Sequence, residues 1–137
     1  MPPGRFTACA LVAVLAAASA GCGNRDARDD VRSAAAAFYA AVARKDGAAA
    51  CRRLGDATRS ELEQSEGAPC AKAVVQLKLQ GGPPARADVF EDSADVQFAG
   101  GDRVFLDHEA GAWRVSAAGC KPEGPATRAP FDCEVQD

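Results

Sequence analysis

Apolar residues recur at helical spacing in the chain that follows position 30. Val31, Ala35, Phe38 and Val42 repeat every three or four positions, as expected of a helix that buries one face. The acidic pair just before them can cap the start of this helix, and Gly47 can end it in a left-handed conformation. The sequence therefore predicts a long first helix that opens at the acidic pair and ends at Gly47.

Shorter helical segments are expected after this first helix. Residues 48–54 are expected to form one helix, which ends at Gly55. Asp56 is placed to cap another helix over residues 57–64, which ends near Gly67. A further helical stretch begins at residues 68–69. Its apolar positions indicate a buried stripe, made of Ala71, Val74, Val75 and Leu77.

A Gly-Gly-Pro-Pro run at residues 81–84 separates two different hydrophobic patterns. After it the period changes from helical to alternating, which is typical of strands with one buried face. Glycine-containing turns at residues 99–102 and 109–111 predict an antiparallel meander, and residues 131–135 predict a last short strand. The alternating apolar positions are Ala87, Val89, Ala94, Val96, Phe98, Val104, Leu106, Trp113 and Val115.

Helices followed by an antiparallel sheet define an α+β arrangement. The length of 137 residues fits a single domain, expected over residues 31–137. One face of the sheet is apolar, and the first helix is long enough to cover it.

The first residues form a signal peptide. Arg5 supplies a positive start, and residues 6–20 are an uncharged run rich in Ala, Val and Leu. As a helix this run would rise only about 22 Å, which is short for a hydrocarbon core of about 30 Å. We therefore expect residues 1–21 to be an export signal and not a permanent anchor.

The end of this signal resembles the lipobox of bacterial lipoproteins. Small residues Ala20 and Gly21 precede Cys22, whose thiol receives a diacylglyceryl group in that family, although Ser19 stands where leucine is commonest. Ordinary cleavage after Ala20 is the alternative. The resemblance implies palmitate-type acylation at Cys22, a polar tether over residues 22–30 and a lipid anchor on the extracytoplasmic face of the cell membrane.

Cysteines outside the leader favour disulfides. The chain has six, and removing the leader cysteine and the lipidated one leaves Cys51, Cys70, Cys120 and Cys133. Three pairings are open, of which we predict Cys51–Cys70 and Cys120–Cys133 because each lies within one local segment. No two cysteines have the Cys-x-x-Cys spacing of a metal site, and His108 is the single histidine. Neither a metal nor another cofactor is therefore expected.

The charge distribution limits the partners. The net charge of −3 argues against nucleic acid, which needs a basic face. Residues 81–137 hold eleven acidic and five basic residues, in contrast to the balanced first half. This acidic half either keeps exposed turns soluble or provides a surface for a cation or a basic partner.

Three segments carry a resemblance to a known group of proteins. Residues 38–51, residues 111–115 and residues 131–134 resemble small lipoproteins of high-GC Gram-positive bacteria, which are similar to the nuclear-transport-factor-2-like, or SnoaL-like, fold. The resemblance implies a cone, in which helices pack into a bent sheet with a pocket at its mouth, and sheet-face homodimers are common there. The same cone serves enzymes, transport factors and binding modules, so it does not define an activity.

Two residues, Tyr39 and His108, are candidates for a catalytic role. Tyr39 stands on the first helix, where the ketosteroid isomerases that resemble this fold use a tyrosine as an oxyanion donor, but the carboxylates that such a site needs are not evident. His108 lies between Asp107 and Glu109 at a strand end and is expected to be a surface or rim residue. Core packing or pocket lining is the expected role of Tyr39, Phe98 and Trp113.

The resulting hypothesis is a non-enzymatic, membrane-anchored module that binds a small apolar ligand or an envelope protein. An isomerase- or dehydratase-like enzyme that uses Tyr39 with an acid or His108 is the first alternative. A structural envelope component with a filled cone is the second. The three differ in whether side chains fill the pocket, which a hydrophobic pattern does not reveal.

Overall fold

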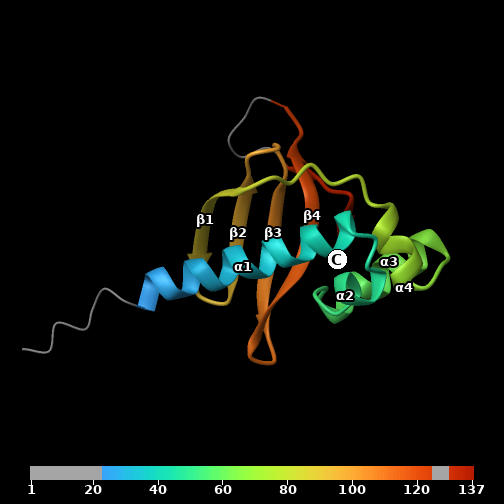
Figure 1. The fold of residues 1–137 in the computed structure, drawn as a ribbon, viewed down its shortest axis with the longest axis horizontal. Coiled ribbons are helices and arrows are strands. Elements are labelled where there is room, and N and C mark those ends of the chain that lie inside the picture. The colour runs from blue at the N-terminus through green and yellow to red at the C-terminus, as the bar shows by residue number, and fades with distance from the viewer. Residues whose placement is uncertain (1–22, 125–129) are drawn as a thin grey trace, which may run out of the picture.

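The structure, a computed structural model, describes residues 23–124 and 130–137. The predicted signal peptide over residues 1–21 and the lipidation of Cys22 lie outside these residues and stay predictions. Within them the chain has the predicted α+β architecture, with N-terminal helices on an antiparallel sheet (Figure 1).

The first helix, α1 (Gly23–Ala43), begins earlier than the sequence indicated. Residues 23–30 of the segment interpreted as a polar tether are helical, and the capping role predicted for the acidic pair, Asp29 and Asp30, is therefore wrong. No apolar stripe marks these turns, but Asp26 in the first turn interacts favourably with the positive end of the helix dipole. The first residue of α1 that is fully buried is Val31, so the turns before it extend beyond the core.

The end of α1 also differs from the prediction. The residue with a left-handed backbone is Lys45, with φ of 59°, and not Gly47. Gly47 is instead the first residue of the next helix, whose N-cap is Asp46, with the carboxylate accepting a hydrogen bond from the amide of Ala49 at 3.0 Å.

Three further helices and a short 3-10 turn form a compact group beside the C-terminal end of α1 (Figure 1). The helix over Asp56–Glu66 has Gly55 as its N-cap, not the predicted Asp56, and Gly67 ends it in a left-handed conformation with φ of 58°. A disulfide between Cys51 and Cys70 links the second helix to the fourth, as predicted. The elements are α2 (Gly47–Cys51), α3 (Asp56–Glu66), α4 (Cys70–Ala73) and a 3-10 turn over Val74–Gln76.

The second half of the chain forms a six-stranded antiparallel sheet in the order β1-β2-β3-β4-β5, with β6 also paired to β4. The alternating apolar positions lie on these strands as expected. The single predicted C-terminal strand is two short ones, which pair with different parts of β4. The strands are β1 (Pro84–Phe90), β2 (Ser93–Phe98), β3 (Arg103–Glu109), β4 (Ala112–Pro122), β5 (Phe131–Asp132) and β6 (Val135–Gln136).

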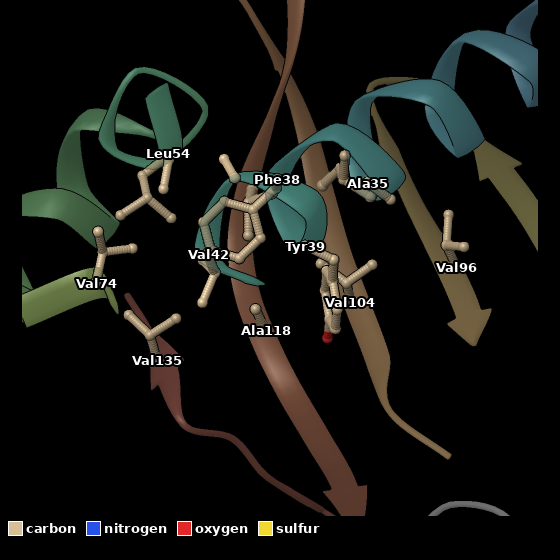
Figure 2. Packing of buried hydrophobic residues seen from close by; sticks show 14 of the residues in the cluster. Ala35, Phe38, Tyr39, Val42, Leu54, Val74, Val96, Val104, Ala118 and Val135 are labelled. Atoms are coloured by element: carbon tan, nitrogen blue, oxygen red, sulfur yellow. The ribbon is translucent and has the colours of Figure 1, made fainter. Parts of the chain in front are cut away.

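The core lies between α1 and one face of the sheet. Figure 1 shows α1 crossing the strands, and Figure 2 shows its apolar side chains turned toward them. Phe38 is fully buried at the centre, among Val104 of β3, Ala118 of β4 and Val74 from the helical group. This burial excludes water from apolar surface and is the main stabilising term of such a fold.

The second predicted disulfide, Cys120–Cys133, is also present and ties the C-terminal strands to β4. Both bridges fit an oxidising, extracytoplasmic location, since disulfides rarely persist in the cytosol.

An extended segment crosses one end of the sheet before β1 begins. We call residues 77–82 the strap; in Figure 1 it runs from the helical group over the tips of the strands. The amide of Gly100 donates to the carbonyl oxygen of Gly81 at 2.6 Å, and the amide of Lys78 donates to Glu134 Oε2 at 3.4 Å. Gly100 has no Cβ, which allows this approach because a Cβ there would overlap the carbonyl groups of the strap.

Candidate functional site

A cleft of about 440 Å³ lies between the strap and the C-terminal half of α1. Its size falls within the range of small-molecule sites, roughly 300–1,000 Å³. The aromatic rings of Tyr39 and Phe98 stack beside it, with centroids 4.1 Å apart and an interplanar angle of 29°. The lining is Ala36, Tyr39, Ala40, Val42, Ala43, Lys45, Leu77, Lys78, Leu79, Gly81, Gly82 and Phe98.

The charged groups of this lining have one sign. Lys45 and Lys78 are its ionisable cations, and no carboxylate belongs to the lining of this cleft in the described chain. Lys45 Nζ also donates to the carbonyl oxygen of Val75 at 2.6 Å, which holds its side chain beside the strap. Such an apolar hollow with two ammonium groups suits a molecule with an apolar body and an anionic end.

Beneath the cleft, Tyr39 takes part in a buried hydrogen-bond network. Its hydroxyl donates to Asp102 Oδ2 at 3.3 Å and accepts from the amide of Gly119 at 3.1 Å. The same Asp102 oxygen accepts from the amide of Gln80 in the strap at 2.6 Å. Four segments therefore meet here: α1, the strap, the β2–β3 turn and β4.

The environment keeps the Tyr39 phenol neutral. Burial raises the pKa of Tyr39 far above its ordinary value, and the nearby Asp102 carboxylate raises it further, while the hydrogen bond from Gly119 opposes both. Since the hydroxyl already has a donor and an acceptor as partners, it has little capacity left to act on a ligand. The isomerase-like role considered for Tyr39 would require this network to break.

Asp102 is the residue of this network that the sequence did not single out. It is 1% exposed, and its second oxygen, Oδ1, is buried without a hydrogen-bond partner among the described residues. In the sequence it appears only as the acidic residue of a Gly-Gly-Asp turn, which is ordinarily solvated. Its burial follows from contacts with distant segments, with Gln80 of the strap and with Tyr39 of α1.

The other sequence candidates lie away from the cleft. His108 is exposed and its ring meets that of Trp113 edge to face, with centroids 5.1 Å apart. The two residues face each other across the β3–β4 hairpin. Of the three residues considered for a pocket, the structure thus brings Tyr39 and Phe98 together at the cleft and leaves Trp113 outside its lining.

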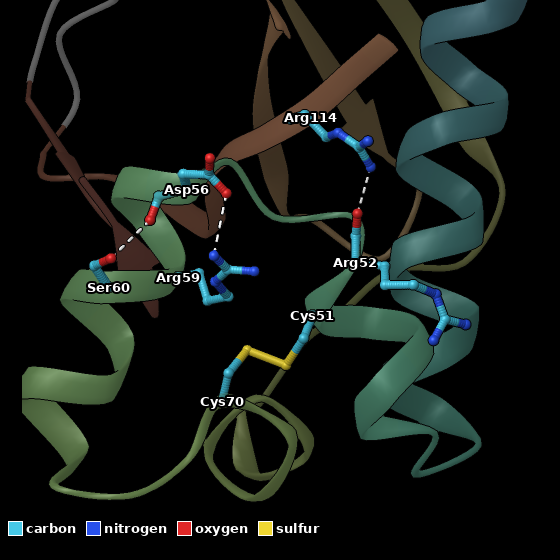
Figure 3. Close-up of polar contacts among 7 residues, drawn as sticks. All are labelled: Cys51, Arg52, Asp56, Arg59, Ser60, Cys70 and Arg114. Carbon is cyan, nitrogen blue, oxygen red and sulfur yellow. Dashed lines mark hydrogen bonds and ion pairs between the residues drawn. A yellow bond between two sulfur atoms is a disulfide. The ribbon is translucent and has the colours of Figure 1, made fainter. Parts of the chain in front are cut away.

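A second hollow, of about 330 Å³, lies where α2 and α3 meet the start of β4 (Figure 3). Two of its three arginines are engaged in structural contacts: Arg114 donates to the carbonyl oxygen of Arg52, and Arg59 pairs with Asp56 at 3.2 Å. Glu109 also lines this hollow, so its charges are mixed. The Arg114 contact joins the helical group to the sheet, whereas the Arg59–Asp56 pair lies within α3, and neither defines a specific ligand.

Two further properties limit the chemistry. Across residues 23–124 and 130–137, no three His, Cys, Asp or Glu side chains come close enough together to hold a metal ion. In the same part of the chain, no helix is both long and apolar enough to cross a membrane.

No protein-family model, curated protein or solved structure matches the chain significantly.

Proposed function

We propose that this chain is an exported lipoprotein, anchored through Cys22, whose domain has the nuclear-transport-factor-2-like cone and binds a small amphipathic anion. The binding site is the cleft between α1 and the strap. The observation that carries the proposal is the lining of that cleft, in which stacked aromatic rings and small α1 residues are combined with Lys45 and Lys78.

The contrast with the rest of the chain supports an anionic ligand. The protein has a net charge of −3, yet the ionisable side chains of the cleft that carry charge at neutral pH are two lysines. An anionic group would gain from both ammonium groups, and its apolar body would cover Tyr39 and Phe98. Binding without catalysis fits the engagement of the Tyr39 hydroxyl by Asp102 and Gly119.

The test is native mass spectrometry of the protein, extracted in mild detergent from membranes of a high-GC Gram-positive host after alkylation without reduction. The mass reports the Cys22 lipid, the number of free thiols and a retained ligand. We expect a diacylated protein without alkylation at the four disulfide cysteines, carrying one small acidic molecule. A protein with no lipid would refute the anchor, and a lipidated protein with no ligand would favour the structural envelope role.

Two matched pairs of variants locate the ligand. Lys78→Gln should reduce retention of the acidic ligand, whereas Lys72→Gln, an exposed lysine on α4 outside the cleft, should not. Ala40→Phe should fill the cleft, whereas Ser33→Phe adds the same ring on an exposed position of α1. Equal retention in Lys78→Gln and Lys72→Gln would contradict binding at this cleft.

A further inference from the structure

The outer face of the sheet, opposite α1, carries a second site of a different kind. Side chains alternate between the faces of a strand. Since Ala94 and Val96 of β2 lie in the core, Ser93 and Asp95 belong to the outer face. By the same alternation Phe105 and Asp107 of β3 are opposite the buried Val104 and Leu106.

The strand register places the larger side chains around a small one. Ser93 is paired with Phe90 of β1 on one side and with Asp107 of β3 on the other. Asp95, the next outward residue of β2, is paired with Phe105. Ser93 therefore forms the floor of a hollow with walls of two aromatic rings and two carboxylates, and a cavity of about 210 Å³ is present there.

The two carboxylates are not balanced by cations to the same degree. Asp95 Oδ2 pairs with the Arg103 guanidinium at 3.1 Å, but Asp95 Oδ1 is buried and has no hydrogen-bond partner in the described chain. Burial raises the pKa of Asp95, and the Arg103 guanidinium only partly opposes this. Asp107 makes no ion pair with any residue of the described ranges, because Arg114 across from it on β4 donates to the carbonyl oxygen of Arg52 instead.

The aromatic walls point to the same ligand chemistry. Phe90 is 64% exposed, unlike the other large apolar side chains that the structure describes, so its ring is available to a ligand in the hollow that it lines. Phe105 is held edge to face by Phe131, with centroids 5.3 Å apart, so its position is fixed. Aromatic faces beside carboxylates recognise organic cations through cation–π attraction and ion pairing.

We propose that the hollow over Ser93 binds an organic cation, an alkylammonium or guanidinium group of the size of a lysine or arginine head. Asp107 pairs with the charge of the ligand, since Asp95 is already paired with Arg103, and Phe90 and Phe105 cover the alkyl part. The group is supplied either by a basic side chain of an envelope protein or by a free amine, which present the same chemistry. This site lies on the opposite face of the sheet from α1 and is independent of the proposed function of the cleft.

Isothermal titration calorimetry on the full, exported and disulfide-bonded protein in mild detergent tests the site. The cationic probes are n-butylammonium, arginine amide and a blocked peptide with one arginine among alanines. The neutral control is the same peptide with citrulline in place of arginine. We expect the cationic probes to bind and the citrulline peptide to bind at least tenfold more weakly. Tighter binding of the peptide than of butylammonium would assign a protein source, and the reverse order a free amine.

Variants connect the binding to the hollow. Asp107→Asn should weaken the cationic probes at least fivefold, and Ser93→Leu should abolish their binding by filling the floor. Glu66→Gln removes an exposed carboxylate at the end of α3 and serves as the matched charge control. Absence of binding by all cationic probes, or an equal loss in Glu66→Gln and Asp107→Asn, would overturn the proposal. Retention of the acidic ligand in the cleft is measured separately, so either proposal can fail alone.

Discussion

The hydroxyl of Tyr39 donates a hydrogen bond to the carboxylate of Asp102, which lies 63 positions further along the chain, at 3.3 Å. Because the Asp102 carboxylate also accepts a hydrogen bond from the amide of Gln80, it connects α1 to both the sheet and the strap. The network is buried, and hydrogen bonds between buried groups are expensive to leave unpaired. Its loss should therefore be visible in the stability of the whole domain.

Replacing Tyr39 by Phe should destabilise the domain by about 1–3 kcal/mol. The variant keeps the ring that stacks on Phe98 but leaves Asp102 and the amide of Gly119 each without one partner. The measurement is the free energy of unfolding in urea. The double-mutant cycle with Asp102→Asn should show a coupling of about 0.5–3 kcal/mol, and purely additive effects would contradict direct contact.

The stability should also decrease at alkaline pH because of Tyr39. Burial raises the folded-state pKa of this phenol above the unfolded value of about 10, so the neutral form is favoured in the folded state. Its contribution is complete below the unfolded pKa and is lost progressively as the pH rises beyond it toward the folded pKa.

The measurement compares the free energy of unfolding of the wild type and Tyr39→Phe between about pH 8 and pH 11. The two proteins differ only at residue 39, so the difference between their two stability curves isolates the contribution of the Tyr39 hydroxyl. The wild type should lose more stability over this interval than the variant. Parallel curves would mean that the Tyr39 phenol is not in a perturbed environment.

The sequence predicted the elements whose signal is local. The alternation around Val96 and Leu106 defined strands, and the spacing of Val31 and Phe38 defined the buried face of α1, because each pattern repeats within a few residues. The two disulfides were also predictable, since both pairs are close in sequence. The helical start at Gly23 was missed because exposed turns carry no apolar period.

The candidate site was only partly predictable, because it depends on contacts between distant segments. Tyr39 and Phe98 were named, but their stacking requires α1 to cross β2. Lys78 and Asp102 gave no signal, since an extended strap and an acidic turn look like ordinary loop sequence. Their roles follow from the position of the strap, which no local pattern specifies.

Gly47 provides a prediction with an unexpected sign. At an exposed helical position, replacing Gly by Ala stabilises by about 1 kcal/mol. Here a Cβ on Gly47 would overlap the backbone carbonyl of Ala71, because α2 and α4 approach closely beside their disulfide. We therefore expect Gly47→Ala to destabilise by about 1–3 kcal/mol, as overpacking does.

The check on this prediction is the urea midpoint of Gly47→Ala beside that of Ala48→Gly. Ala48 is exposed on the same helix, so its replacement should cost about 0.5–1 kcal/mol through helix propensity alone. Both variants should be less stable than the wild type. A stabilised Gly47→Ala would show that α2 and α4 can separate without cost.

The two disulfides should differ in what their removal releases, although each closes a loop worth about 3 kcal/mol in the chain-entropy model. Cys51–Cys70 joins two helices, and Cys70 packs in the hydrophobic core cluster, to which Cys120 does not belong, so the double Ser variant of this bridge should lower the unfolding free energy of the whole domain. Cys120–Cys133 secures two strands of two residues each, which pair only with β4. Its double Ser variant should mainly free the C-terminal residues from 130 onward.

Hydrogen exchange read by mass spectrometry distinguishes the two disulfides. For Cys120→Ser/Cys133→Ser, we expect a loss of protection confined to β5 and β6. An equal loss of protection across α1 would show that this bridge, too, stabilises the core.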